Sequence, residues 1–335
     1  MKNKDYRILV TGGSGFIGTN LIEYLLENYK PIDILNIDIA DPKIKDHYSL
    51  WKKVDILDKE KLSSTIKSFN PTHVVHLAAK PSLYGKTIED FPEIVQGTEN
   101  LVLALNDNKS VKRFIHVSTQ FVCYPGVYPQ SDDDYSPYSI YGLSKVESEK
   151  IIKSIDPSFE WLILRPTNIW GPWHPSYPYE MWPYLKKRYY MHPGYSKVVK
   201  HYGFVINVCY QISEFLFNVD INKVSKKAFY TTDPKITSEE WLNAFSVALS
   251  GKKINRIPKF IWFVLASFGS LVKALKINFP VDLGRYFRTT VNENLPVEKT
   301  IELMDYDANA IKLDEAVKLT VDWLKTNLNE FKDPN

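Results

Sequence analysis

Cysteine is scarce in this chain of 335 residues, because only Cys123 and Cys209 occur, far apart and in no metal-ligand spacing. A disulfide framework is therefore excluded, no metal site is expected, and a reducing, cytoplasmic setting is predicted. The first residues lead directly into a strand-like run, and we expect no signal peptide.

Long hydrophobic runs are lacking as well. The longest uncharged apolar stretch, Phe260–Val272, has 13 residues, whereas a helix that crosses a bilayer needs about 20. We therefore expect no transmembrane segment and interpret this stretch as a buried helix. The alternative is a helix over residues 257–275 that lies on a membrane surface or faces a partner.

The chain also lacks a strong charge of either sign, with 42 basic residues, 39 acidic residues and a net charge of +3. This balance gives no indication of a nucleic-acid partner, and none is predicted, although local clusters can still bind small anions. The apolar share of 44% is typical of a folded protein with a large core.

The first half of the sequence alternates β-rich runs with helix-length segments. Apolar strands that alternate with helices favour a parallel sheet covered on both faces, which is a doubly wound α/β fold. The expected strands are Arg7–Val10, Ile32–Ile37, Trp51–Val54, His73–Leu77, Arg113–Val117 and Trp161–Leu164. The expected helices are Phe16–Asn28, Asp58–Ser68, Phe91–Asn106 and Tyr138–Ile155.

The composition changes after Pro172 to a stretch crowded with Trp, Tyr, Pro and Lys. Residues 234–275 then indicate two helices, and Leu313–Leu324 indicates a last amphipathic one. We therefore expect a cofactor-binding domain over residues 1–172 and a smaller, mainly substrate-binding lobe over residues 173–335. Some segments of the second part are expected to return to the first.

A glycine-rich motif, Thr11–Gly18, lies between the first expected strand and the first expected helix. Glycine permits a tight turn, lets the backbone approach a pyrophosphate and brings the helix close to the strand. Free amides and a partial positive charge at the helix N-terminus then favour phosphate groups. The predicted dinucleotide contacts are Gly12, Gly15, Phe16, Ile17 and Gly18.

Three further positions in the sequence indicate which dinucleotide binds and where it lies. Asp38 ends the second strand, where a carboxylate can accept hydrogen bonds from the adenosine ribose and would repel a 2′-phosphate, so NAD is predicted over NADP. Asp55, with its neighbour Ile56, follows the third strand and could contact the adenine. The run that ends the fourth strand would let the cofactor lie close to the backbone at Leu77, Ala78 and Ala79.

The pair Tyr141 and Lys145 indicates proton transfer, because the two residues share one face of a helix. A free tyrosine has a pKa near 10, and a lysine ammonium one turn away favours the phenolate, so Tyr141 is expected to titrate below a free tyrosine. Tyr141 could then exchange a proton with an alcohol while the carbon exchanges hydride. Thr119, at the carboxyl edge of the sheet, is expected to hold the reacting oxygen, with Ser118 as the alternative.

Together these residues resemble the extended short-chain dehydrogenase/reductase superfamily, and within it the NAD-dependent epimerase/dehydratase group. The matching positions are Thr11–Gly18, Asp38, Asp55, His76–Ala79, Gly97–Asn100, Val117–Thr119, Tyr141–Lys145 and Arg165–Pro172. The resemblance implies a Rossmann lobe with a small C-terminal substrate lobe, often in a homodimer. It also implies that Thr119, Tyr141 and Lys145 are catalytic, that Pro166 lies near the nicotinamide, and that Asn168 lies near a substrate phosphate.

Departures from the family pattern narrow the chemistry. The 4,6-dehydratases of the family carry an Asp-Glu pair directly after the catalytic threonine, where this chain has Gln120 and Phe121. The substrate-lobe motif, an Arg followed by an aromatic-Val-Asp run, corresponds to Lys200–Val208, in which the aspartate is replaced. The predicted substrate contacts are Lys80, Gln120, Asn168 and Lys200.

We therefore expect an NAD-dependent epimerase that acts on a nucleotide sugar through a transient keto intermediate. Basic and aromatic residues at 186–202 could hold the diphosphate and stack the base, with a solvated basic surface as the alternative. The second hypothesis is a net reductase or dehydrogenase of a keto sugar or a hydroxysteroid-like alcohol, which the apolar segment 257–275 would suit. The third, a non-catalytic nucleotide-binding protein, is disfavoured because Tyr141 and Lys145 are both present.

Overall fold

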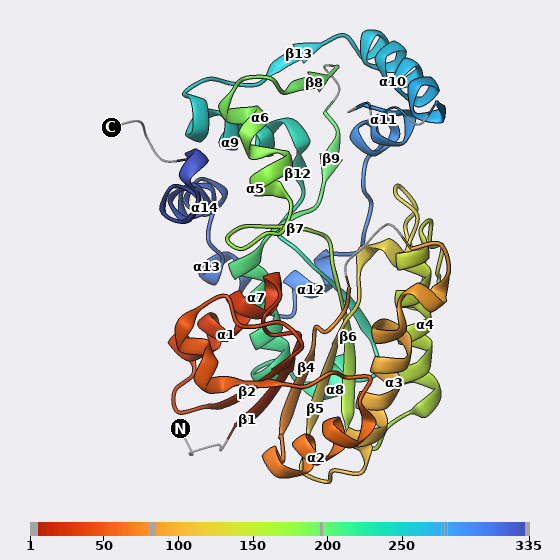
Figure 1. Cartoon of the computed structure of the whole chain (residues 1–335), viewed down its shortest axis with the longest axis vertical. Coiled ribbons are helices and arrows are strands. Elements are labelled where there is room, and N and C mark those ends of the chain that lie inside the picture. The colour runs from red at the N-terminus through yellow and green to blue at the C-terminus, as the bar shows by residue number, and fades with distance from the viewer. Residues whose placement is uncertain are drawn as a thin grey trace.

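The computed structural model of the chain (Figure 1) describes residues 6–80, 85–194, 197–275, 277, 279 and 281–331. Its strands are β1 (Arg7–Thr11), β2 (Asp33–Asp38), β3 (Trp51–Lys53), β4 (His73–His76), β5 (Arg113–Val117), β6 (Glu160–Pro166), β7 (Asn168–Trp170), β8 (Met191–Pro193), β9 (Val199–Lys200), β10 (Tyr202–Phe204), β11 (Ala228–Thr231), β12 (Ile236–Thr237) and β13 (Asn255–Ile257). Its α-helices are α1 (Phe16–Asn28), α2 (Lys59–Phe69), α3 (Pro92–Asn106), α4 (Ile140–Ile155), α5 (Tyr177–Glu180), α6 (Trp182–Lys186), α7 (Val205–Phe217), α8 (Ile221–Val224), α9 (Ser238–Ser250), α10 (Lys259–Ala274), α11 (Leu283–Thr290), α12 (Glu298–Ile301), α13 (Tyr306–Asn309) and α14 (Leu313–Asn327).

Seven strands form one sheet in the order β11-β6-β5-β4-β1-β2-β3, and every neighbouring pair is parallel. The strand order reverses between β1 and β4, which is where open α/β sheets bind ligands at the carboxyl ends of their strands. The predicted doubly wound α/β fold is confirmed. The six strands and four helices expected in the first half all end within two residues of the observed bounds.

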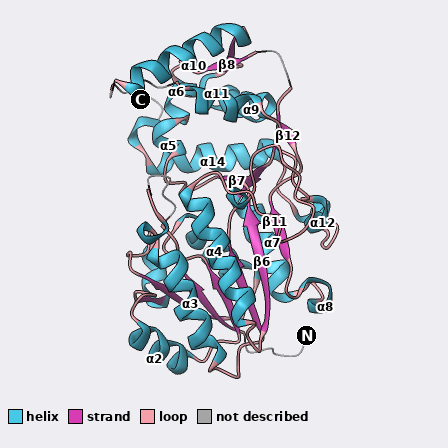
Figure 2. Ribbon diagram, turned by 90° about the vertical axis from the view of Figure 1, so that its right-hand side faces the viewer, coloured by secondary structure: helices cyan, strands magenta, loops and turns pink. Residues whose placement is uncertain are grey.

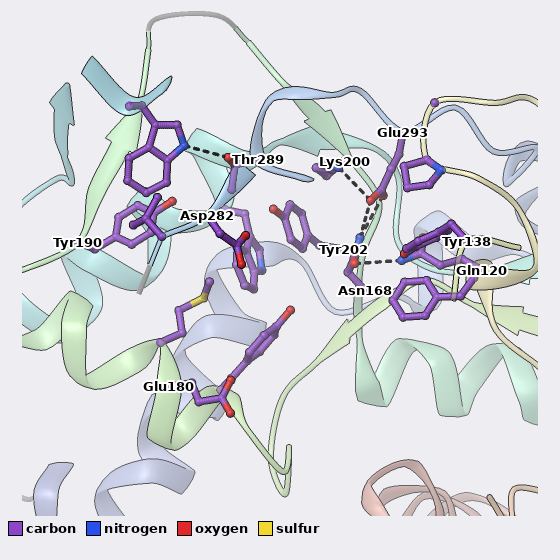
Figure 3. Close-up of a pocket in the computed structure, with 18 of the residues that line it drawn as sticks. Gln120, Tyr138, Asn168, Glu180, Tyr190, Lys200, Tyr202, Asp282, Thr289 and Glu293 are labelled. Carbon is purple, nitrogen blue, oxygen red and sulfur yellow. Dashed lines mark hydrogen bonds and ion pairs between the residues drawn. The ribbon is translucent and has the colours of Figure 1, made fainter. Parts of the chain in front are cut away.

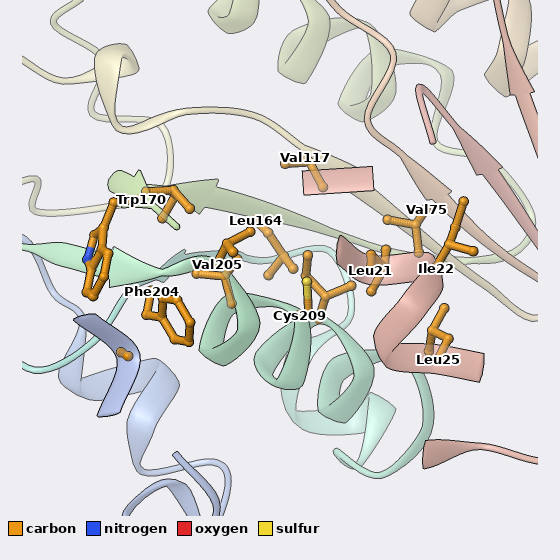
Figure 4. Close-up of a cluster of buried hydrophobic side chains, with 14 of the residues drawn as sticks. Leu21, Ile22, Leu25, Val75, Val117, Leu164, Trp170, Phe204, Val205 and Cys209 are labelled. Atoms are coloured by element: carbon orange, nitrogen blue, oxygen red, sulfur yellow. The ribbon is translucent and has the colours of Figure 1, made fainter. Parts of the chain in front are cut away.

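Alternate residues of the central strands pack into two different hydrophobic cores, because successive side chains of a strand point to opposite faces. On β1, Ile8 and Val10 join the core covered by α1 and α7, whereas Leu9 joins the core covered by α2 and α3. Figure 4 shows the first of these cores, with Leu21 of α1 and Cys209 of α7. Burial of both faces explains why the strands read as nearly continuous apolar runs.

The chain passes between two lobes more than once. After α5 and α6 in the small lobe, it returns through α7, which packs against α1, and through β11, which pairs with β6. Trp170 and Trp241 belong to the same core as Leu21, so the core continues from the sheet into the small lobe. Figures 1 and 2 show the sheet lobe at one end of the long axis and α9, α10 and α11 at the other.

The apolar stretch predicted as a buried helix forms α10, but the prediction of burial is wrong. Its buried residues are Trp262, Ala266 and Gly269, whereas Phe260 and Leu271 are each 71% exposed. The reason is position, since α10 lies at the outer end of the small lobe and α11 covers one side of it. Among the described residues, no helix is long and apolar enough to cross a membrane.

Asp233 joins three separate segments just after β11. Its carboxylate accepts hydrogen bonds from Phe204 N (3.0 Å), Asn207 Nδ2 (3.1 Å) and the Tyr306 hydroxyl (2.6 Å). Burial raises the pKa of this carboxyl to about 6, and the three donors oppose the rise. The network therefore links the sheet lobe to the start of α7 and to α13.

Replacement of Asp233 by alanine tests this network. Asp233→Ala leaves three donors without their acceptor, and each unsatisfied buried donor costs about 1–3 kcal/mol, while loss of a desolvated carboxylate offsets part of that cost. We expect the free energy of unfolding to fall by about 2–4 kcal/mol in urea denaturation. Asp307→Ala is the control, because Asp307 is exposed and lies 3.7 Å from Lys312. Equal stability of the two variants would show that the network contributes nothing.

Candidate active site

The glycine-rich loop turns from β1 into α1 at the carboxyl edge of the sheet. Gly12 has φ +72°, a left-handed conformation that L side chains rarely adopt, and a Cβ there would lie 2.6 Å from Ala78 N. A Cβ on Gly18 would overlap the carbonyl oxygen of Gly12. Gly15, between them, is exposed. The close approach of helix, loop and strand that the motif predicted is therefore present.

The two predicted aspartates lie at the ends of the next two strands. Asp38 Oδ2 accepts a hydrogen bond from Ser14 N (3.0 Å), and its Oδ1 accepts one from Ala40 N (2.9 Å). The carboxylate is thereby held beside the glycine-rich loop, where an acceptor for the ribose was expected. Asp55 is exposed, and its Oδ1 accepts a hydrogen bond from Leu57 N (2.9 Å), so this side chain also stabilises its own turn.

The remaining predicted cofactor residues gather around the same edge of the sheet. These residues are Phe16, Ile17, Ile56, Leu77, Ala78, Ala79 and Pro166. Ala78 N donates to Thr11 Oγ1 (3.2 Å), which also bonds to His76 Nδ1 (2.6 Å). The end of β4 is thus fixed to the start of the glycine-rich loop.

The predicted catalytic residues converge from β5 and α4. Thr119 follows β5, and Tyr141 and Lys145 lie one turn apart on α4. Burial raises the pKa of Tyr141 to about 12, and a hydrogen bond with Thr119 opposes the rise. Lys145 Nζ donates to Val117 O (2.9 Å). Burial lowers the pKa of this lysine to about 8, although nearby carboxylates oppose the fall.

The expectation that Tyr141 titrates below a free tyrosine is wrong for this structure. The Lys145 ammonium is directed to a backbone carbonyl, and the pKa of the tyrosine is set by burial and by Thr119. The rings of Phe91 and Phe121 lie 6.1 and 6.2 Å from that of Tyr141, and apolar surroundings disfavour the phenolate. Ionisation of Tyr141 therefore needs a further positive charge at this place.

A pocket of about 950 Å³ opens next to these residues, between the sheet and the small lobe (Figure 3). Phe121, whose ring faces Tyr141, lines it from the side of the sheet. The wall is largely aromatic, with rings that include Tyr138, Tyr177, Tyr190, Tyr202, Trp241 and Trp262. Trp262 comes from α10, so the outermost helix contributes to the wall.

Three of the four predicted substrate residues meet around one carboxylate in this pocket (Figure 3). Gln120 Nε2 donates to Asn168 Oδ1 (3.0 Å), and Asn168 Nδ2 donates to both carboxylate oxygens of Glu293 (3.1 and 3.0 Å). Lys200 Nζ forms an ion pair with Glu293 Oε1 (3.1 Å), and the two side chains are only 8% and 11% exposed. The positive charge of Lys200 is thereby neutralised within the protein.

Other predicted basic contacts lie outside this pocket. Lys80 is exposed after β4 and is not part of the lining. Lys186 and Lys187 contact Glu330, and Arg188 donates to the carbonyl of Lys253. None of these three basic residues lines the pocket, so the hypothesis that they hold a diphosphate does not fit this pocket. The aromatic neighbours that follow them do line the pocket.

Glu293 is a pocket residue that the sequence did not reveal. It belongs to no motif and is the one acidic residue between Asp282 and Glu298, which is a weak signal by itself. It lies 125 positions from Asn168 in the sequence, so only the fold brings the two together. A second ion pair at the pocket, Lys273 Nζ with Asp282 Oδ2 (2.7 Å), was also not predicted.

The pKa of Lys145 leads to a test of stability against pH. A lysine with a pKa of about 8 in the folded chain and 10.5 unfolded destabilises the fold below pH 8, and this cost disappears as the pH rises from 8 through 10.5. We expect Lys145→Met to raise the free energy of unfolding by about 1–3 kcal/mol at pH 7, and by less at pH 9.5. Thermal unfolding at both pH values measures this change. Lys150→Met, an exposed lysine on the same helix, is the control, and a loss of stability of Lys145→Met at pH 7 would contradict the expectation.

The model of the NAD dependent epimerase/dehydratase family matches residues 8–205. A dTDP-D-glucose 4,6-dehydratase from Dictyostelium discoideum is 31% identical over 206 residues, which cover 51% of this chain and 46% of that protein. A UDP-glucose 4-epimerase from Vibrio cholerae is 34% identical over 176 residues, which cover 49% and 52%. The match thus spans about half the length of these curated relatives.

The likeness of fold extends over the whole chain. The crystal structure of UDP-glucuronic acid 4-epimerase from Bacillus cereus, in complex with UDP-glucuronic acid and NAD, is similar with a TM-score of 0.71 and 19% identity. The superposition covers 95% of this chain and 99% of that one. With the family match over more than half of its length, this chain belongs to the NAD-dependent epimerase/dehydratase family of extended short-chain dehydrogenases/reductases.

Proposed function

We propose that this chain is an NAD-dependent epimerase of nucleotide sugars, which oxidises a ring hydroxyl to a ketone and then reduces it from the opposite face. The observation that carries the proposal is the convergence of Thr119, Tyr141 and Lys145 where β5 ends against α4, beside the aromatic pocket that Phe121 lines. Hydride exchange at a secondary alcohol needs a proton carrier between a dinucleotide and a substrate, and we assign that role to Tyr141.

The residues around the glycine-rich loop fit NAD. Gly12 lets the loop pack directly against the backbone of Ala78, and the N-terminus of α1 offers free amides to a pyrophosphate. Asp38 supplies the ribose acceptor whose charge opposes a 2′-phosphate. The similar UDP-glucuronic acid 4-epimerase was crystallised with NAD. When bound, NAD would accept and return the hydride, and its positive nicotinamide ring, near Pro166, would favour the phenolate of Tyr141.

The protons of the reaction are moved by side chains of the chain itself. Tyr141 takes the hydroxyl proton as the carbon is oxidised and returns it on reduction. The Thr119 hydroxyl, hydrogen-bonded to Tyr141, orients the reacting oxygen. Lys145, with a pKa of about 8, is mostly charged at pH 7, and its ammonium is held by Val117 O one helical turn from Tyr141.

The pocket supports epimerisation over loss of water. Gln120 is an amide and Phe121 a hydrocarbon, so neither can protonate or deprotonate a sugar. The nearby carboxylate of Glu293 is already paired with Lys200 and hydrogen-bonded to Asn168. An oxidised sugar would therefore meet Tyr141 as its proton donor, and reduction is the step open to it.

A net oxidoreductase is the second candidate, and one observation favours it. Both lysines that line the pocket are paired with carboxylates, Lys200 with Glu293 and Lys273 with Asp282. The pocket therefore offers little unpaired positive charge to bind a diphosphate. Its aromatic wall would suit an apolar alcohol or a keto sugar.

We further propose a reducing, cytoplasmic setting, which the free and buried thiols of Cys123 and Cys209 support. A homodimer, expected from the resemblance, stays a prediction.

The cofactor balance separates the two candidates. We expect incubation with NAD and UDP-sugars to give a product of inverted configuration at one ring carbon, with no net change in absorbance at the NADH wavelength, because the hydride returns within each cycle. Product stereochemistry by NMR and NADH absorbance measure the two quantities together. NADH formed in proportion to product would replace the epimerase proposal with the net oxidoreductase.

Replacement of Tyr141 tests the mechanism for either candidate. Tyr141→Phe keeps the ring and its packing but removes the proton-carrying oxygen, so turnover should fall by about 10²–10⁴-fold with NAD binding nearly intact. Thr119→Val should lower turnover less, because Thr119 orients the hydroxyl without carrying the proton. Tyr48→Phe, at an exposed tyrosine of the sheet lobe, is the control. Wild-type turnover of Tyr141→Phe would refute the assignment and leave the fold unaffected.

A further inference from the structure

α10 presents an apolar face to solvent at the end of the small lobe. Phe260, Phe263, Val264, Phe268 and Leu271 follow the helical spacing of three and four residues, and each is between 46% and 71% exposed. A contiguous apolar patch of this kind marks an interaction surface rather than scattered surface residues.

The opposite side of α10 is firmly packed. Buried Trp262 donates from Nε1 to Thr289 Oγ1 (3.3 Å) of α11. Gly269 lies so close to the backbone of Val281 that no side chain would fit between them. The exposed face is therefore a fixed property of the folded lobe, because contacts on the other side hold the helix in this orientation.

The segment that carries this face is rich in positive charge. Residues 252–288 contain eight basic residues and one acidic residue, which gives a net charge of +7. Because the whole chain carries +3, the rest of it carries −4. Lys252, Lys253 and Lys259 are exposed near the start of α10, and Lys273 is exposed near its end.

We propose that α10 docks in the plane of an anionic lipid surface. An interfacial helix buries its apolar face at the headgroup boundary, while flanking basic side chains meet anionic headgroups. α10 combines both features in 16 residues, too short a length to span a bilayer. A second copy of this chain is a poorer occupant, because two such faces would bring two charges of +7 together.

The position of α10 suits a flat partner. Figures 1 and 2 show it running across one end of the long axis, far from the sheet lobe. Trp262 lines the pocket from this same helix, so docking brings the outer wall of the pocket to the lipid surface. The proposal does not depend on which alcohol the pocket accepts.

Cosedimentation of the full chain with vesicles tests the proposal. We expect binding to phosphatidylcholine vesicles that contain about 30% phosphatidylglycerol to be at least about tenfold stronger than binding to pure phosphatidylcholine, and to weaken at about 0.5 M salt. Equal binding to both kinds of vesicle, or binding to neither, would overturn the proposal.

Substitutions on the exposed face identify the docking element. The affinity of the double variant Phe260→Ser/Leu271→Ser for anionic vesicles should be at least about tenfold lower than that of the wild type. Its melting temperature should be unchanged. Leu103→Ser/Leu319→Ser, which removes two exposed leucines from α3 and α14, should bind like wild type. Wild-type binding by the first variant would overturn the proposal. So would a wild-type dimer in analytical ultracentrifugation that the first variant dissociates, because a second copy would then cover the face.

Discussion

The substrate side of the pocket depends on one buried carboxylate. Glu293 accepts hydrogen bonds from the side chains of Asn168 and Lys200 and from the backbone of His201, and it thereby joins β7, β9 and the loop after α11. Loss of either member of a buried ion pair leaves an uncompensated charge, which costs about 3–5 kcal/mol. The pocket thus keeps its shape through internal charge pairing, and the charge of Lys200 is neutralised within the protein.

The features that could be predicted from the sequence are those encoded within one strand, one turn or one helix. The glycine-rich loop and the Tyr141–Lys145 pair each lie within a few residues, and their geometry follows from local rules. The roles of Glu293 and of the Lys273–Asp282 pair could not be predicted, because contacts between distant segments produce no periodic pattern in the sequence. The exposure of α10 was missed for a related reason, since apolar composition does not reveal which surface remains uncovered.

Tyr141 and its neighbour Lys145 lie in buried surroundings that disfavour the charged form of each side chain. Burial raises the pKa of Tyr141 and lowers the pKa of Lys145, so ionising either side chain costs free energy. Active sites often retain such strained groups because they serve the reaction rather than stability. In the proposed mechanism the phenol acts as a base only when the cofactor adds a positive charge beside it.

The position of β11 means that the sheet lobe is not a removable module. β11 pairs with β6 although 61 residues, 167 to 227, lie between the two strands and build β7 to β10 and the helices α5 to α8. A fragment that stopped at Pro172 would leave β6 as a bare apolar edge strand, and it would uncover the core that α7 shields. Such an edge invites pairing with other chains, and the large sequence separation of the pair slows folding. Ribosomal synthesis must therefore reach Thr231, past the α5 and α6 segment of the small lobe, before all seven strands of the sheet are available.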